Sequence, residues 1–314
     1  MTKLNERIKK APEDTIHKSW VHRISPDFAW GYLQLMRADR PIGTWLLLWP
    51  GLWSIVLASH FHGNQMIIPD INLLLLFSLG AIVMRGAGCV VSDLWDRDAD
   101  GKVKRTKKRP IPSGRVSVFG AIIFLIFLSL IGLYILLQLN NFAQIVGAAS
   151  LILIIIYPLM KRITYWPQLM LGFTFNWGAL LGWAAITGTI ELPAALLYIG
   201  GIFWTLGYDT IYAHQDREED KIIGIKSTAL RLGSNTHRWL IIFYGCSLLF
   251  YLAAGWYSKM GFWFYPGMLF AGVHFIYQYS SLDINNRETC LKIFKSNHHF
   301  GIIVFISLIM GHNF

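Results

Sequence analysis

The stretch 92-SDLWDRDADGKVKRTKKRP-110 follows the apolar run 73-LLLLFSLGAIVM-84. Four aspartates fall between positions 93 and 100, and lysines and arginines crowd behind them. A similar stretch returns as 207-GYDTIYAHQDREEDKIIGIKSTALR-231, so that nine of the 18 acidic residues lie in 93–100 and 209–220. Charge this concentrated in an apolar chain resembles a weak internal repeat, in which two helical units bring equivalent acidic clusters together at the ends of apolar segments.

The chain around these stretches has the composition of a membrane protein. Of its 314 residues, 54% are hydrophobic and 15% are charged, and the mean hydropathy is +0.44. About 20 apolar residues cross a bilayer as one helix. We therefore predict an all-α, polytopic fold of about nine transmembrane helices, at 42–60, 71–92, 117–138, 142–160, 167–188, 192–213, 238–258, 263–280 and 299–313.

The positive charge follows the predicted topology. The net charge is +10, but 26 of the 28 lysines and arginines fall in five segments, 1–41, 93–116, 161–166, 214–238 and 281–298. Basic residues therefore mark alternate connections between spans, as the positive-inside rule requires. This pattern predicts a cytoplasmic N-terminus, places both acidic stretches on the cytoplasmic side, and explains the charge without a nucleic-acid partner.

The N-terminal segment bears on domain organisation and location. Residues 1–20 have no apolar core and contain acidic residues, which argues against a cleavable signal peptide and against a mitochondrial presequence. We therefore expect a multi-pass protein of the bacterial inner membrane. Residues 1–28 are predicted to be a cytoplasmic extension, and 29–314 a single transmembrane domain with a weak internal repeat.

The acidic pairs share a helical spacing. Asp96 and Asp100 are four residues apart, Asp216 and Asp220 likewise, and the second pair repeats the first after 120 residues. Positions i, i+4 and i+7 share one face of a helix. The predicted stripes are Ser92, Asp96 and Asp100, with Asp93 seven residues before Asp100, and Asp209, Asp216 and Asp220.

Carboxylates held together repel one another unless a cation bridges them. Oxygen ligands with few His or Cys residues nearby suit Mg²⁺, which binds carboxylates together with substrate phosphates. One acidic loop alone is more typical of a solvated face, whereas a matched pair favours a site. The predicted metal ligands are Asp96, Asp100, Asp216 and Asp220, with Ser92 and Asp93 as further candidates. The bases expected to bind phosphate are Lys102, Lys104, Arg105, Arg109 and Lys226. The cysteines, Cys89, Cys246 and Cys290, show neither disulfide nor zinc spacing.

The chain resembles the UbiA-type membrane prenyltransferases, and most closely those that act on 4-hydroxybenzoate. The family motif Asn-x3-Asp-x3-Asp falls on Ser92, Asp96 and Asp100, with Ser92 in place of the usual Asn. The resemblance covers roughly residues 30 to 310. It includes Asp209, Tyr212, Ala213, Asp216 and Asp220 of the second motif and the stretches 37-RADRPIGTWLLLWPGLW-53, 85-RGAGC-89, 104-KRTKKRPIPSG-114, 157-YPLMKRITYWPQ-168 and 224-GIKSTA-229.

The resemblance implies a fold and a reaction. The helices are expected to surround a central cavity open to the cytoplasm, with the acidic motifs above it. The implied reaction is the Mg²⁺-dependent transfer of a polyprenyl group from its diphosphate to 4-hydroxybenzoate, ortho to the hydroxyl, in ubiquinone biosynthesis. Asp96, Asp100, Asp216 and Asp220 are the implied catalytic residues, and Asp209 is expected at the substrate.

Four further basic residues lie outside the acidic stretches. Arg40, Lys161 and Arg162 are at ends of predicted spans, where each is either a topology anchor or a ligand of diphosphate or carboxylate. We favour Arg162 for the benzoate because its guanidinium binds a carboxylate through two parallel bonds. Arg85 lies deeper on the face of the first acidic stripe, and a structural ion pair with Asp209 is predicted for it.

Two alternatives remain open at this stage. A cation-coupled transporter also places acids in helices and contains repeats, but here the acids lie at one face and are flanked by bases that repel a cation. Another acceptor, of the haem, naphthoate or chlorophyll type, fits the same motifs, and the choice among acceptors rests on family analogy.

Overall fold

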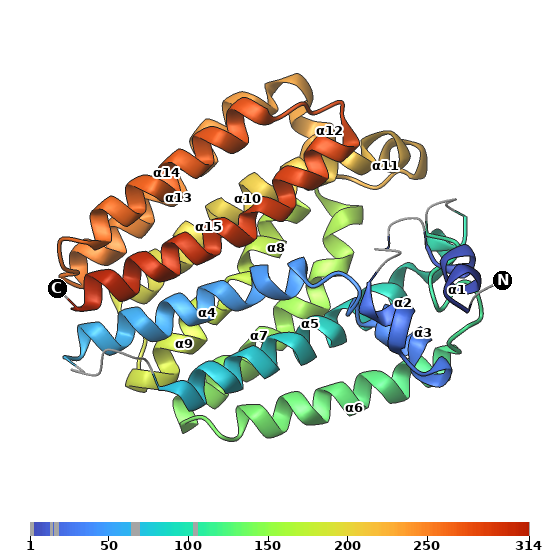
Figure 1. Cartoon of the computed structure of the whole chain (residues 1–314), viewed down its shortest axis with the longest axis horizontal. Helices are drawn as coiled ribbons and strands as arrows, with labels where there is room; N and C mark the ends of the chain where they lie inside the picture. The colour runs from blue at the N-terminus through green and yellow to red at the C-terminus, as the bar shows by residue number, and fades with distance from the viewer. Residues whose placement is uncertain (1–2, 13–14, 16–18, 64–69, 103–105, 314) are drawn as a thin grey trace. The chain divides into compact units, whose positions relative to one another are not determined.

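The computed structural model describes residues 3–12, 15, 19–63, 70–102 and 106–313. Every regular element in these ranges is a helix, which confirms the predicted all-α class (Figure 1). The elements are α1 (Lys3–Lys10), α2 (Trp20–Ile24), α3 (Asp27–Leu35), α4 (Ile42–Phe61), α5 (Ile71–Asp100), α6 (Val118–Leu136), α7 (Asn141–Ile163), α8 (Pro167–Phe175), α9 (Trp177–Thr187), α10 (Leu192–Ala213), η1 (His214–Asp216), α11 (Arg217–Ile223), α12 (Thr228–Leu232), η2 (Gly233–Asn235), α13 (Thr236–Tyr257), α14 (Phe264–Ser281) and α15 (Arg287–Asn313).

Eight helical segments of the described chain are long and apolar enough to cross a membrane. They correspond to eight of the nine predicted spans. The ninth prediction, 263–280, is a helix, α14, but it is less apolar because it carries polar residues that bond inside the helical bundle. Gln278 accepts from Tyr244 Oη at 2.7 Å and donates to Asn297 Oδ1 at 3.1 Å. A partnered polar network of this kind is tolerated among packed helices.

The chain divides into two compact units. Unit 1 comprises Met1–Thr44 and Leu79–Ile135, and unit 2 comprises Trp45–Ser78 and Leu136–Phe314. Helix α5 begins in unit 2 and enters unit 1 at Leu79, so its acidic end belongs to unit 1. The predicted boundary after residue 28 is not tested by this division and stays a prediction.

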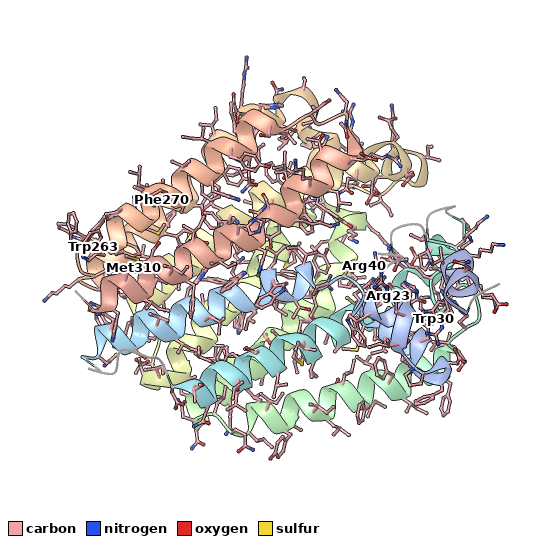
Figure 2. The ribbon with its side chains drawn as sticks, in the orientation of Figure 1. Arg23, Trp30, Arg40, Trp263, Phe270 and Met310 are labelled. Atoms are coloured by element: carbon pink, nitrogen blue, oxygen red, sulfur yellow. The ribbon has the colours of Figure 1, made fainter. Side chains whose placement is uncertain are left out.

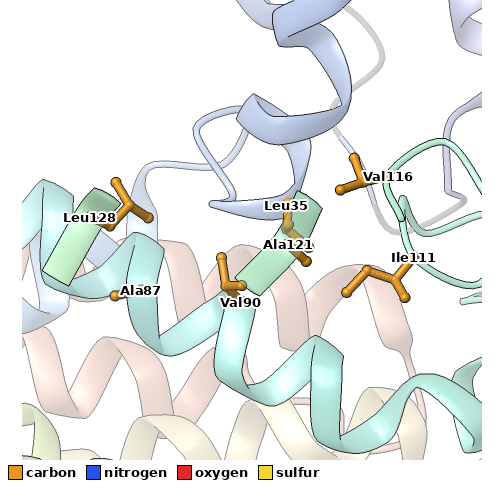
Figure 3. Packing of buried hydrophobic residues seen from close by; sticks show 7 residues of the cluster. All are labelled: Leu35, Ala87, Val90, Ile111, Val116, Ala121 and Leu128. Carbon is orange, nitrogen blue, oxygen red and sulfur yellow. The ribbon is translucent and has the colours of Figure 1, made fainter. Parts of the chain in front are cut away.

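The core of unit 1 joins α3, α5 and α6 to the loop that precedes α6. Figure 3 shows its seven buried residues, Leu35, Ala87, Val90, Ile111, Val116, Ala121 and Leu128. Two of them, Ile111 and Val116, come from the loop, and they pack in the same cluster as Val90 of α5. Their burial holds the loop near the end of α5, where the aspartates lie.

In unit 2, α10 packs against α8, α9, α13 and α15, and α14 packs against α13 and α15 (Figure 1). The turn between α8 and α9 is fixed by Asn176, whose Nδ2 donates to Gly172 O and to Thr205 Oγ1, both at 2.8 Å. Position 201 requires glycine, since a Cβ there would come within 2.1 Å of Asn176 Oδ1. Large apolar side chains remain exposed on α14, α15 and the turn before α14, as Trp263, Phe270 and Met310 show in Figure 2. Such side chains suit contact with lipid.

Candidate active site

The first acidic stripe lies on one unbroken helix. Helix α5 runs to Asp100, so Ser92, Asp96 and Asp100 share a face as their spacing predicts. Asp93 and Asp100 are buried, whereas Ser92 and Asp96 are half-buried. The predicted geometry of this stripe is therefore confirmed, and two of its carboxylates have little contact with solvent.

Two arginines bind the buried carboxylates of α5. Arg37 Nη2 donates to Asp93 Oδ1 at 2.6 Å, and Arg109 Nη1 donates to Asp100 Oδ2 at 2.8 Å. Arg109 Nη1 also lies 3.6 Å from Asp93 Oδ1. The two arginines and two aspartates thus form a continuous charged chain, in which Asp93 lies between the guanidinium groups.

The buried position of Asp100 changes its acidity. Burial raises the pKa of this carboxyl above its usual range, and Asp93 adds to the rise, while Arg109 opposes it. Within the described part of the chain, Asp93 Oδ2 is also buried without a hydrogen-bond partner. A group of carboxylates with these properties favours the arrival of further positive charge.

Sequence reasoning did not single out Arg37 as a site residue. Its backbone is left-handed, with φ of +60°, which is uncommon for a residue other than glycine. Its Nη1 donates to Gln34 O at 3.1 Å, so the guanidinium is held by the backbone as well as by Asp93. The motif 37-RADRP-41 contains the residue, but nothing in the motif indicates its partner.

The side chain of Arg40 lies against that of the preceding residue, Asp39. Asp39 is buried and accepts one hydrogen bond from Thr15 Oγ1, and Arg40 Nε lies 3.4 Å from Asp39 Oδ2. The side chain of Arg40, labelled in Figure 2, is partly exposed. Its predicted role at the substrate stays a prediction.

The other predicted bases of unit 1 differ in their surroundings. Lys102 is exposed at the end of α5, and Arg105, like Lys104, lies outside the described residues. Arg85 donates to Cys89 Sγ at 2.5 Å and lies against Gly43, where a Cβ would come within 2.5 Å of its Nε. Its predicted pair with Asp209 joins the two units and stays a prediction.

The second acidic stretch does not repeat the geometry of the first. Helix α10 ends at Ala213, and the 3₁₀ turn η1 leads into α11. Each residue of such a turn advances by about 120° rather than 100°, so Asp216 and Asp220 are rotated relative to Asp209. The second stretch is therefore not one unbroken α-helix, and the single stripe predicted for these three residues stays a prediction. The turn lies where buried His214 bonds Thr236 Oγ1 at 2.9 Å.

Unit 2 brings together three of the predicted substrate-binding bases. Lys226 N donates to Lys161 O at 2.9 Å, and Lys226 Nζ donates to Ile163 O at 3.0 Å. Lys161 Nζ lies 5.7 Å from the centre of the Tyr157 ring. Arg162, which lies between Lys161 and Ile163 in the chain, is exposed. Segments 157–163 and 224–228, which are distant in sequence, therefore form one basic surface.

Hydrogen bonds fix the loop that carries Lys226. Thr228 N donates to Gln168 Oε1 at 3.0 Å, and the hydroxyls of Thr210 and Thr228 are 2.7 Å apart. Gln168 and Thr210 are buried on α8 and α10. Because Thr210 follows Asp209 directly, these bonds tie Lys226 to the helix that bears the second acidic stretch.

The donor chemistry of the acidic residues fits Mg²⁺, since carboxylate oxygens are its preferred protein ligands. Among the described residues, however, no group of three His, Cys, Asp or Glu side chains is assembled as a metal site. The predicted ligands are divided between unit 1 and unit 2. Mg²⁺ typically binds through one or two carboxylates together with substrate phosphates.

Comparisons with known proteins identify relatives over most of the chain. Residues 47–309 match the model of the UbiA prenyltransferase family. A protein of Drosophila melanogaster is 51% identical over 281 residues, which cover 89% of this chain and 71% of the relative. One of Arabidopsis thaliana is 47% identical over 297 residues, covering 94% and 72%. Both relatives are named 4-hydroxybenzoate polyprenyltransferase, mitochondrial.

A solved structure shares the fold. It is described as a UbiA homolog from Archaeoglobus fulgidus bound to GPP and Mg²⁺, and it is 18% identical to this chain. The TM-score is 0.65, and the match covers 90% of this chain and 99% of the homolog. This likeness supports the helical architecture.

The expected location, a bacterial inner membrane, is wrong. The relatives from an insect and a plant carry names that place them in mitochondria. The expectation relied on the acidic residues of segment 1–20. Acidic residues argue against a typical mitochondrial presequence, but they do not identify the membrane in which the protein lies. The apolar spans that identify a membrane protein have the same character in either membrane.

Proposed function

The chain belongs to the UbiA prenyltransferase family, and from this we propose that it transfers a polyprenyl group from polyprenyl diphosphate to 4-hydroxybenzoate. The product is 3-polyprenyl-4-hydroxybenzoate, an intermediate of ubiquinone biosynthesis. The observation that carries the proposal is the identity of about half of all positions, over nine-tenths of the chain, with relatives that bear this activity in their names. The same names favour a mitochondrial membrane.

Mg²⁺ is the cofactor of the proposal. Asp96 and Asp100 in unit 1 and Asp216 and Asp220 in unit 2 would hold it together with diphosphate, with Ser92 as a further oxygen ligand. When bound, Mg²⁺ would neutralise the charge of diphosphate and make it a better leaving group. Support comes from the carboxylate donors and from the related structure bound to GPP and Mg²⁺.

The basic residues are proposed to neutralise the part of the diphosphate charge that Mg²⁺ does not. Arg109 and Lys226 each lie in the same unit as one acidic stretch, and guanidinium and ammonium groups form strong charge-assisted bonds to phosphate oxygens. As the allylic C–O bond breaks, its electron pair leaves with diphosphate. These residues stabilise the negative charge that develops on diphosphate. Electrostatic stabilisation of this kind is usually the largest single contribution to catalysis.

Carbon 3 of 4-hydroxybenzoate supplies the electron pair for the new bond. The hydroxyl activates this ring position, and loss of the proton on carbon 3 restores the aromatic ring. The polyprenyl chain is insoluble in water and belongs among the apolar helices. Water must be kept from the allylic cation during transfer, since it would capture the prenyl group as an alcohol.

Arg162 is proposed to bind the carboxylate of the acceptor. It is exposed, and it lies on the basic surface that contains Lys161 and Lys226. Its guanidinium can donate two parallel hydrogen bonds to a carboxylate, which fixes the orientation of the ring as well as its charge.

A cation-coupled transporter is disfavoured, because the relatives at about 50% identity are named as transferases. Their shared name also favours 4-hydroxybenzoate over the haem, naphthoate and chlorophyll types of acceptor.

The proposal is tested by an assay of membranes that contain the protein. Polyprenyl diphosphate should be supplied with 4-hydroxybenzoate, a naphthoate acceptor, haem and a chlorophyll precursor in separate reactions, and products should be identified by mass spectrometry. We expect prenylated 4-hydroxybenzoate, formed only with Mg²⁺ and lost with a chelator. Transfer to another acceptor with none to 4-hydroxybenzoate would refute the acceptor assignment while leaving the family intact.

Asp93 is proposed to position arginines rather than to bind metal. One of its oxygens is already bound by Arg37 and approached by Arg109. Asp93→Asn keeps the shape but removes the charge, and losing such a charged contact costs about 1.5–3 kcal/mol. We expect the apparent KM for polyprenyl diphosphate to rise roughly tenfold or more, with the Mg²⁺ concentration for half-activity unchanged.

The matched control for this variant is Asp98→Asn on the same helix. Asp98 has an exposed side chain and lies 3.5 Å from Arg97, and its substitution should leave both quantities unchanged. If Asp93→Asn instead raises the Mg²⁺ requirement, with the KM for diphosphate unaffected at saturating metal, then Asp93 is a metal ligand.

A further inference from the structure

Three large apolar side chains point outward from the N-terminal part of unit 1. Trp20 is 51% exposed, Ile24 is 76% exposed and Phe28 is 82% exposed. Trp20 and Ile24 are four residues apart on α2 and so share its outer face. Phe28 follows at the start of α3. We call these three residues the apolar row.

The opposite side of this segment is packed and polar-bonded. Val21 and His22 of α2 are buried, and His22 Nδ1 accepts from Trp30 Nε1 at 3.1 Å. Ser25, at the end of α2, is buried as well. The apolar row therefore remains exposed because of a defined fold of the segment, with its neighbours in the sequence turned inward.

A buried arginine of α1 fixes the position of α2 and of the start of α3. Arg7 of α1 is 4% exposed, and its Nη1 donates to His22 O at 3.2 Å and to Ser25 Oγ at 3.4 Å. Its Nη2 bonds Asp27, and its guanidinium carbon lies 5.5 Å from the centre of the Trp30 ring. Helix α2 has only five residues and would not be stable alone. These bonds hold it in place with its apolar side outward.

One exposed basic residue lies within the apolar row, and Asp27, which bonds Arg7, is exposed beside Phe28. Arg23, labelled in Figure 2, is exposed on α2 between Trp20 and Ile24. An exposed apolar row with an exposed arginine between two of its residues matches the chemistry of an anionic lipid surface.

The covalent chain keeps this segment close to a membrane. Helix α4, a candidate span, begins at Ile42, seven residues after α3 ends at Leu35. Seven residues reach at most about 25 Å when fully extended. Tryptophan and arginine are also residues typical of the boundary between lipid and water.

We propose that α2 and the start of α3 form an interfacial anchor on an anionic leaflet. Trp20, Ile24 and Phe28 enter the headgroup boundary, and Arg23 pairs with lipid phosphates. The anchor lies outside the spans and takes no part in the chemistry of prenyl transfer. Because α3 leads directly into Arg37, it would fix the depth at which the arginine pairs of unit 1 face the bilayer.

The test is a depth measurement in the full-length protein. The native cysteines, Cys89, Cys246 and Cys290, are replaced by alanine, Ile24→Cys is introduced, and the new thiol is labelled with the fluorophore NBD. The protein is reconstituted into phosphatidylcholine vesicles with phosphatidylglycerol, with and without nitroxide-bearing lipid. We expect blue-shifted emission and quenching by the nitroxide of roughly half or more, since a residue in the interface lies within about 10 Å of the acyl boundary.

The matched control is Glu6→Cys with the same label. Glu6 is exposed on polar α1 in the same unit, so its probe should emit as in water and be quenched little. Arg23→Ala, added to Ile24→Cys, should reduce quenching in vesicles with phosphatidylglycerol and have little effect in phosphatidylcholine alone. If the probe at position 24 resembles that at position 6, the anchor does not exist. Blue-shifted emission without lipid quenching would show that the row contacts protein, and would equally overturn the proposal.

Discussion

Asp96→Ala and Asp216→Ala are each expected to abolish prenyl transfer in protein that remains folded. In the wild-type protein, Asp96 and Asp216 are each proposed to bind the metal that neutralises the diphosphate. Removing a single fixed group that stabilises developing charge typically lowers kcat by about a hundredfold to a thousandfold. Loss of a metal ligand should therefore reduce the rate to the background of the assay, measured as radiolabelled product with saturating substrates and Mg²⁺.

The control for both variants is Asp98→Ala, which lies between the two proposed ligands of α5. Its side chain is 88% exposed, and its ion pair with Arg97 is at the surface. A substitution there should leave the rate within about twofold, since such surface pairs contribute little. Substantial activity in either Asp96→Ala or Asp216→Ala would contradict a site that requires both acidic stretches.

Arg162→Ala should separate the acceptor from the donor. Loss of a bidentate charged contact costs a few kcal/mol, which corresponds to roughly ten- to hundredfold in binding. We expect the apparent KM for 4-hydroxybenzoate to rise by this factor, with little change in that for polyprenyl diphosphate. Arg162→Lys should recover only part of the loss, because an ammonium group cannot reproduce the two parallel bonds.

The neighbouring residue supplies the comparison. Lys161→Ala removes a base from the same surface, but the ammonium of Lys161 lies 5.7 Å from the centre of the Tyr157 ring. If Arg162→Ala raises only the KM for diphosphate, Arg162 belongs with the phosphate-binding bases, and Arg40 becomes the candidate for the carboxylate. If neither KM changes, Arg162 is a topology anchor.

Most of the fold could be predicted from the sequence because an apolar segment of about 20 residues crosses a bilayer as a helix. Backbone groups must be paired within the segment, which makes it a helix. Helix α14 was predicted as well, although it is less apolar, and its Gln278 has partners on α13 and α15 as well as His274 of α14 itself. Pairing of this kind depends on helices distant in sequence, so hydropathy alone does not show it.

The candidate site was predicted less evenly. On α5 the spacing of Asp96 and Asp100 was sufficient, because the helix continues through both. At the second stretch the α-helix is interrupted by the 3₁₀ turn η1, where buried His214 bonds Thr236. Likewise, the partner of Asp93 is Arg37, 56 residues away, held in a left-handed conformation that a residue other than glycine rarely adopts. Tertiary contacts decided both features.

The central claim is that acidic residues of both units hold one diphosphate through divalent metal. It is tested most directly by Mn²⁺ binding, followed by electron paramagnetic resonance in vesicles. The ligand is a polyprenyl thiolodiphosphate, in which sulfur replaces the bridging oxygen and slows cleavage. We expect wild-type protein to bind Mn²⁺ tightly only with this ligand, and both Asp96→Ala and Asp216→Ala to lose that binding. Wild-type binding in either variant would contradict a shared metal–diphosphate site.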